Sequence, residues 1–132
     1  MSREDEVRAS FARQGLMRTL GAEMLEVGGG RCMVAAPIRE ESGQQHGFGH
    51  AGLAFALGDT AAGYAAMSAA ESGDVLTVEM KINLMAPARG ARLVATGQVV
   101  RAGRRITVVT AEVVAEPEGR VVAILQGTMV PA

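Results

Sequence analysis

Hydrophobic and polar residues alternate regularly between residues 75 and 85. Every second residue from Leu76 to Leu84 is apolar, and the residues between them are Thr77, Glu79, Lys81 and Asn83. A period of two is typical of a β-strand with one packed face, so we predict a strand here with Thr77 on its polar face. Three further runs have the composition of strands and are separated by turns that contain glycine or proline: 93–100, 106–115 and 120–130.

Nearer the N-terminus, apolar residues flank a run of three glycines at 28–30. Glycine readily adopts the positive φ angles of tight turns, so residues 20–38 are predicted to form a hairpin. The polar residues 40–49 show neither a helical nor a strand period and are expected to form a loop. Residues 1–19 are predicted to be a helical segment at the periphery, with a surface helix over residues 3–13.

The stretch 51–70 contains nine alanines and no proline, and it is apolar on nearly every face. That pattern is typical of a helix buried all round, so we predict a central helix over residues 51–72. Two predicted strands precede it and four follow it through short turns, which favours an antiparallel sheet. We therefore predict one α+β domain over residues 1–132, with an antiparallel sheet wrapped around one long central helix.

Composition and charge narrow the possible functions. Thirteen basic and 14 acidic residues without a long block of either sign give no sign of nucleic-acid or anionic-membrane binding. A membrane span over 51–70 is not expected, because alanine and glycine dominate the stretch and Asp59 interrupts it. The acidic N-terminus does not look like a secretory signal, and the single Cys32 is expected to be a buried residue without catalytic function, so we expect a cytoplasmic protein.

Asp59 is the candidate for chemistry, because it is the only charged residue between Gly47 and Ala70. A carboxylate buried without a partner costs several kcal/mol, so it should have a partner or a catalytic function. Alternatively, Gly58 breaks the helix and Asp59 caps a second one. No cluster of His, Cys and carboxylates has the spacing of a metal site, and no nucleotide-binding glycine motif is present, so no metal or redox cofactor is expected.

The sequence Gly49-His50-Ala51-Gly52 stands where the central helix should begin. A helix N-terminus has free N–H groups, and a glycine lets a ligand carbonyl approach the backbone, so Gly52 is a candidate oxyanion donor. Gly52 and Asp59 share one helix face but lie about 10 Å apart along the axis, too far for both to act on one substrate carbon. A second, antiparallel copy of the helix would solve this, so the spacing predicts a dimer with two equivalent sites.

These segments resemble the hotdog thioesterases typified by the phenylacetate-degradation enzyme, and the resemblance covers nearly the whole chain after residue 20. It rests on four segments: Gln44-Gln45-His46-Gly47-Phe48-Gly49-His50-Ala51-Gly52, Leu57-Gly58-Asp59-Thr60-Ala61-Ala62-Gly63-Tyr64-Ala65-Ala66, Thr77-Val78-Glu79-Met80-Lys81-Ile82-Asn83-Leu84-Met85-Ala86-Pro87-Ala88, and the turn Arg101-Ala102-Gly103-Arg104-Arg105.

The resemblance implies roles for six residues. Asp59 matches the acidic residue that acts in that family as nucleophile or as base for water, and His50, Ala51 and Gly52 match the His-Gly-Gly segment that binds the thioester carbonyl. Gln44 stands where a residue that is usually Asn positions water or substrate. Thr77 matches a Ser or Thr that some members use, although solvent exposure or a subunit contact explains its position equally well. His50 is expected to form a positioning hydrogen bond rather than to act as the base.

The resemblance further implies an acyl-CoA substrate, with no cofactor apart from the CoA of the substrate itself. Arg104 and Arg105 lie where the family meets the CoA phosphates, and guanidinium groups suit phosphate geometry, although arginines in turns are often simply solvated. Other expected substrate contacts are Ala51, Tyr64, Met85 and Pro87. The family often pairs two dimers, so we expect a homotetramer built from dimers.

Two other functions remain open from the sequence alone. A hydratase or dehydratase on this fold would need an Asp and a His acting on one water, and the spacing of Asp59 and His50 does not obviously provide this. A non-catalytic module that binds acyl-CoA is the second alternative, although it would leave Asp59 in the central helix unexplained. The identity of the acyl group, and whether Asp59 acts as nucleophile or base, are not determined by the sequence.

Overall fold

The computed structural model describes residues 1–132, and its elements follow the predicted order. Their bounds are α1 Arg3–Ala12, α2 Gly15–Leu20, β1 Glu23–Gly28, β2 Arg31–Pro37, a short 3-10 helix Glu40–Ser42, α3 Ala51–Ala69, β3 Val75–Leu84, β4 Arg92–Ala102, β5 Thr107–Glu116 and β6 Arg120–Pro131. The three glycines at 28–30 have positive φ angles between β1 and β2, which confirms the predicted hairpin turn. The central helix ends three residues earlier than predicted.

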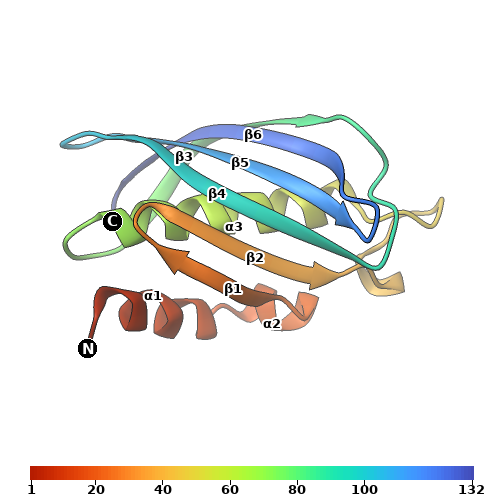
Figure 1. Ribbon diagram of the computed structural model, residues 1–132, viewed down its shortest axis with the longest axis horizontal. Coiled ribbons are helices and arrows are strands. Elements are labelled where there is room, and N and C mark those ends of the chain that lie inside the picture. Colours follow the sequence, from red (N-terminus) through yellow and green to blue (C-terminus); the bar gives the residue numbers. More distant parts are fainter.

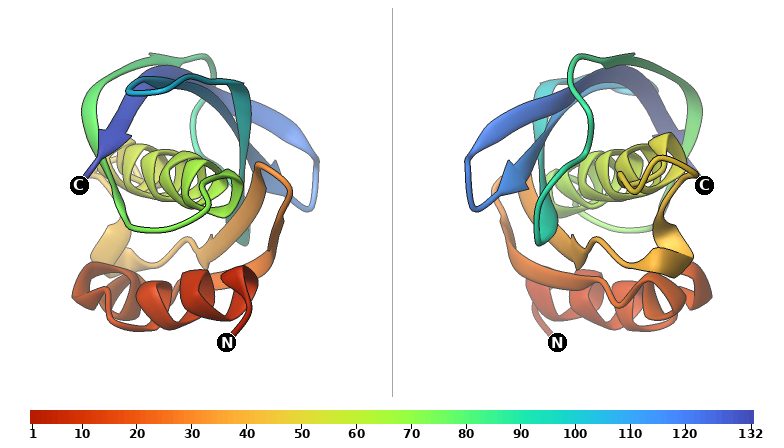
Figure 2. Two further views of the ribbon diagram at one scale, coloured as in Figure 1. Left: turned by 90° about the vertical axis from the view of Figure 1, so that its left-hand side faces the viewer. Right: turned by 90° about the vertical axis from the view of Figure 1, so that its right-hand side faces the viewer.

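The six strands form one antiparallel sheet in the order β1-β2-β4-β5-β6-β3. The sheet curls around α3, which lies along its concave side, and α1 and α2 lie below the helix on the side of β1 and β2 (Figures 1 and 2). This arrangement confirms the predicted sheet wrapped around one central helix. It leaves β1 and β3 as the two edge strands.

Small residues let α3 lie close to the sheet. A Cβ atom at Gly97 of β4 would lie 2.4 Å from the backbone of Ala61, so only glycine fits where the helix crosses the strand. Gly58 on the helix faces Leu125 of β6, and an added Cβ would come within 2.8 Å of the methyl groups of this buried leucine. The helix is continuous through this point, so the alternative in which Gly58 breaks it is wrong.

The expectation of a helix buried all round is wrong for one face of α3. Leu53, Leu57 and Ala61 are fully packed against the sheet, whereas Gly52 and Phe55 are exposed and Asp59 is only partly buried. Alanine and glycine occur on both the buried and the open face of α3. The sequence therefore shows no contrast in hydrophobicity between the two faces. The open face runs along the helix from its first turn to Asp59 and beyond.

The N-terminal segment lies on the surface, as predicted, but contributes two side chains to the core. Val7 of α1 and Met17 of α2 are fully buried and belong to the same core as α3. Ser2 caps α1 by accepting the Asp5 N–H, and Arg3 fixes the helix by donating to the carbonyl oxygens of Met67 and Gly73. The segment therefore forms a wall beside the open face of α3.

Strand β3 corrects the predicted placement of Thr77. The pairing of β3 with β6 shifts register between Thr77 and Glu79, which is a β-bulge at Val78. The bulge reverses the alternation of the strand, so Thr77 faces inward opposite the buried Met129. Strict alternation through residues 75–85 therefore gave the wrong face for Thr77.

Candidate active site

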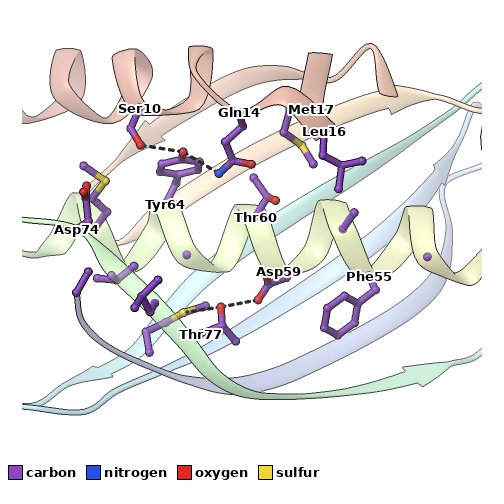
Figure 3. A pocket seen from close by; sticks show the side chains of 18 residues that line it. Ser10, Gln14, Leu16, Met17, Phe55, Asp59, Thr60, Tyr64, Asp74 and Thr77 are labelled. Carbon is purple, nitrogen blue, oxygen red and sulfur yellow. Dashed lines mark hydrogen bonds between the residues drawn. The ribbon is translucent and has the colours of Figure 1, made fainter. Parts of the chain in front are cut away.

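The open face of α3 forms the floor of a pocket of about 680 Å³. Its upper wall comes from α1, α2 and the residues between them, and its lower wall comes from the beginning of β3 (Figure 3). Four of the residues expected to act on substrate line it: Gly52, Asp59, Tyr64 and Thr77. Residues far apart in the sequence therefore meet here, and two of them, Asp59 and Asp74, are carboxylates.

The side chains of Asp59 and Thr77 are joined by a hydrogen bond across the lower wall. Thr77 Oγ1 donates to Asp59 Oδ1 over 2.7 Å and lies 3.2 Å from the sulfur of Met129 (Figure 3). The other carboxylate oxygen, Oδ2, has no donor within the chain. The bond fixes the side chain of Asp59 while Oδ2 remains available to a ligand or a water molecule.

His50 caps α3 by accepting the N–H of Gly52 at its Nδ1 over 2.7 Å. An acceptor Nδ1 carries no proton, so a neutral His50 in this arrangement has its proton on the exposed Nε2. The Gly52 N–H, which is expected to bind the thioester oxygen, therefore already donates a hydrogen bond to His50. A ligand oxygen must replace the imidazole to reach it.

Gln44, His50, Ala51, Met85 and Pro87 line a second pocket of about 590 Å³ instead of the first. The amide oxygen of Gln44 accepts the N–H groups of His46 and Phe48, so this side chain stabilises its own loop. Within one chain, the predicted site is thus divided: Asp59 and Thr77 lie in one pocket, and Gln44 and His50 lie in the other.

Arg104 and Arg105 lie at the far end of the molecule, in a small pocket between the β4–β5 turn and the end of α3. Asp74 and Val75 line both this pocket and the pocket that holds Asp59. The two pockets are therefore neighbours that share part of their lining.

Tyr64 lines the pocket but its hydroxyl is held by the N-terminal segment. Gln14 Nε2 donates to the Tyr64 oxygen over 2.9 Å, and the Ser10 hydroxyl lies 3.0 Å away in a hydrogen bond (Figure 3). The phenol ring also packs edge-on against Phe11. Ser10 and Gln14, together with the pocket-lining Leu16 and Met17, were missed from the sequence, and no motif there marked them.

Cys32 is fully buried in β2, and burial raises the pKa of its thiol to about 12. A thiol held in its protonated form is a poor nucleophile, which agrees with the expectation that Cys32 is a packing residue. No group of three or more His, Cys, Asp or Glu side chains is arranged to hold a metal ion. None of the helices combines the length and hydropathy that a membrane crossing requires.

Comparisons with known proteins agree with this geometry. The family model of the thioesterase superfamily matches residues 46–122. A solved thioesterase family protein from Silicibacter pomeroyi is 42% identical, with a TM-score of 0.94 and coverage of 98% of this chain and 97% of its own. A point variant of the phenylacetic acid degradation protein PaaI from Thermus thermophilus is 29% identical, with a TM-score of 0.81 and coverage of 90% and 100%. A candidate esterase from Halobacterium salinarum is 33% identical over 125 residues, which are 86% of this chain and 82% of that protein.

An antiparallel sheet wrapped around a central helix is the hotdog fold, and its open helix face here carries a carboxylate in a pocket. The chain belongs to the thioesterase superfamily. The enzyme class that this membership assigns is the thioester hydrolase.

Proposed function

We propose that the protein hydrolyses acyl-CoA thioesters, with Asp59 as the group that attacks the thioester carbonyl or activates water. The observation that carries the proposal is the Asp59 carboxylate in an open pocket, with Oδ1 bound by Thr77 and Oδ2 free. A carboxylate with one fixed and one free oxygen is suited to accept a proton from water. Thr77 acts as a positioning residue for it.

In the general-base route, Asp59 takes a proton from a water molecule whose oxygen bonds to the thioester carbon. The Gly52 N–H stabilises the resulting oxyanion after the ligand oxygen has replaced His50 Nδ1. Collapse of the tetrahedral intermediate breaks the C–S bond, and the leaving thiolate takes the proton from Asp59. In the nucleophilic route, an Asp59 oxygen bonds to the thioester carbon and the C–S bond breaks, so that CoA leaves as the thiolate. Water then hydrolyses the resulting anhydride to the free acid and the Asp59 carboxylate, and its released proton goes to the thiolate.

The proposed active unit is a homodimer, because one chain keeps Asp59 and the Gln44–His50 loop in different pockets. The edge strand β3 is uncovered and exposes Leu76, Val78 and Leu84, which are 60%, 57% and 56% accessible. An apolar edge of this kind favours pairing with a second copy. Two-fold pairing along β3 would place Asp59 of one subunit near Gly52 of the other, and two such dimers form the proposed tetramer.

The adjoining pockets support CoA as the leaving group. Arg104 and Arg105 line the neighbouring pocket at the C-terminal end of α3, which shares Asp74 and Val75 with the pocket of Asp59. Two guanidinium groups at that end would pair with phosphates. The proposal includes no metal and no cofactor other than the CoA of the substrate, and it places the enzyme in the cytoplasm, where acyl-CoA occurs.

Thiol release from a panel of acyl-CoA thioesters, compared with the matching oxygen esters, tests this function. We expect turnover of thioesters from the wild-type protein without added metal. A wild-type protein that binds acyl-CoA but releases no thiol would contradict the proposal and identify a binding module.

A further inference from the structure

Gly63 lies in the middle of α3, where glycine is unfavourable for a helix. Nothing in the fold requires it, because a Cβ atom placed there would meet only the end of Met129, at 3.8 Å. That distance is an ordinary van der Waals contact. The space above Gly63 is therefore empty within the chain.

The other two glycines of α3 have evident reasons within the chain. A Cβ at Gly58 would come within 2.8 Å of Leu125, and one at Gly52 would come within 2.9 Å of the His50 imidazole. Gly63 differs from both, since alanine would fit there and would favour the helix. Because packing within the chain does not require glycine at this position, the glycine indicates that the open space over it receives a ligand.

The space over Gly63 belongs to the pocket of Asp59. Gly63 follows Asp59 by four residues, so it lies on the same helix face about 6 Å farther along the axis. Beyond it stand Tyr64 and the N-terminal wall formed by Ser10 and Gln14 (Figure 3). Ser10 and Gln14 lie outside residues 46–122, the part of the chain that matches the family model.

We propose that the acyl group lies across Gly63 toward the N-terminal wall, and that Gly63 is the residue that sets the size of the acyl group. The inference rests on the proposed function, because it places the thioester carbonyl at Asp59. It assigns the preferred substrates to acyl groups that reach at least one helical turn past the carboxylate, such as octanoyl or phenylacetyl. Acetyl is too short to reach Gly63.

The test compares wild type with Gly63→Ala and Gly63→Val on acetyl-, butyryl-, octanoyl- and phenylacetyl-CoA. One added methyl group should lower kcat/KM for the two larger substrates by about tenfold relative to acetyl-CoA, and valine should lower it further. Gly63→Ala should also raise Tm. Gly58→Ala is the matched control, because its collision with Leu125 should lower Tm and leave the ranking of substrates unchanged.

Binding of non-hydrolysable octyl- and phenethyl-CoA thioethers, measured by calorimetry, separates this inference from the proposed function. If the wild type has no turnover but binds the thioethers, and Gly63→Ala weakens that binding about tenfold, only the proposed function fails. An equal loss on all substrates, no loss at all, or no thioether binding by the wild type would overturn the role of Gly63. A change of subunit assembly in Gly63→Ala would overturn it as well, because the space would then belong to a partner helix.

Discussion

Thr77 Oγ1 donates a hydrogen bond of 2.7 Å to Asp59 Oδ1, joining the edge strand β3 to the central helix. The bond exists because the bulge at Val78 turns Thr77 inward. Its consequence is a carboxylate with one oxygen bound and the other open to the pocket. This pair is the structural basis of the proposed chemistry.

Replacing Thr77 by valine keeps the shape of the side chain and removes the hydroxyl. We expect kcat to fall by about tenfold with little change in KM, because a hydrogen bond to a charged group positions Asp59. Thr77→Ser should retain most of the activity. Steady-state thiol release measures both variants, and a valine variant with wild-type kcat would show that the bond has no part in the reaction.

The cap formed by His50 should contribute to stability independently of activity. We expect His50→Ala to lower the free energy of unfolding by about 1 kcal/mol, because the Gly52 N–H loses its acceptor. His50→Asn should restore most of that loss, since asparagine is a favourable N-cap residue. Urea denaturation measures both, and a His50→Ala variant as stable as the wild type would exclude a capping contribution.

The buried thiol of Cys32 predicts slow labelling and a specific pH dependence. Its pKa rises from 9.0 to about 12 on folding, because burial disfavours the thiolate. The folded state therefore holds the proton more tightly, so this stabilising contribution is complete below pH 9 and is lost as the pH rises toward 12. A thiol reagent at pH 8 should leave the native protein unmodified and label one cysteine per chain in denaturant; rapid labelling of native protein would contradict this.

A charge on the exposed edge strand tests the proposed dimer. Val78 is 57% accessible and lies at the bulge of β3, so Val78→Lys should leave the folded chain intact while opposing pairing with a second copy. We expect sedimentation to show a monomer and thiol release to be lost together. An active monomeric variant would show that one chain suffices for catalysis.

The sequence was sufficient to predict the fold because strands, turns and the alanine-rich helix each carry a strong local signal. The hairpin at the three glycines and the order of elements follow from residue type and period alone. The sequence-based predictions were wrong where tertiary packing determines which way a side chain faces. The bulge that turns Thr77 inward cannot be recognised in the sequence, because the residues around it still alternate between apolar and polar. The mostly polar sequence of α1 likewise did not indicate that Val7 is buried.

The candidate site was only partly predictable for a similar reason. Asp59 was conspicuous because it is a lone charge in an apolar helix, and its spacing from Gly52 suggested a shared site. The contribution of Ser10 and Gln14 could not be predicted, since it depends on how the N-terminal segment folds back onto Tyr64. The engagement of the Gly52 N–H by His50 is likewise a matter of side-chain conformation.

The most direct test of the account is the kcat for thiol release by Asp59→Asn, measured on the best acyl-CoA substrate of the wild type. Asparagine keeps the size and can still accept from Thr77, but it cannot act as a base or an effective nucleophile. The account predicts a fall of about a thousandfold with an unchanged fold and assembly. A folded Asp59→Asn protein with nearly wild-type kcat would contradict it.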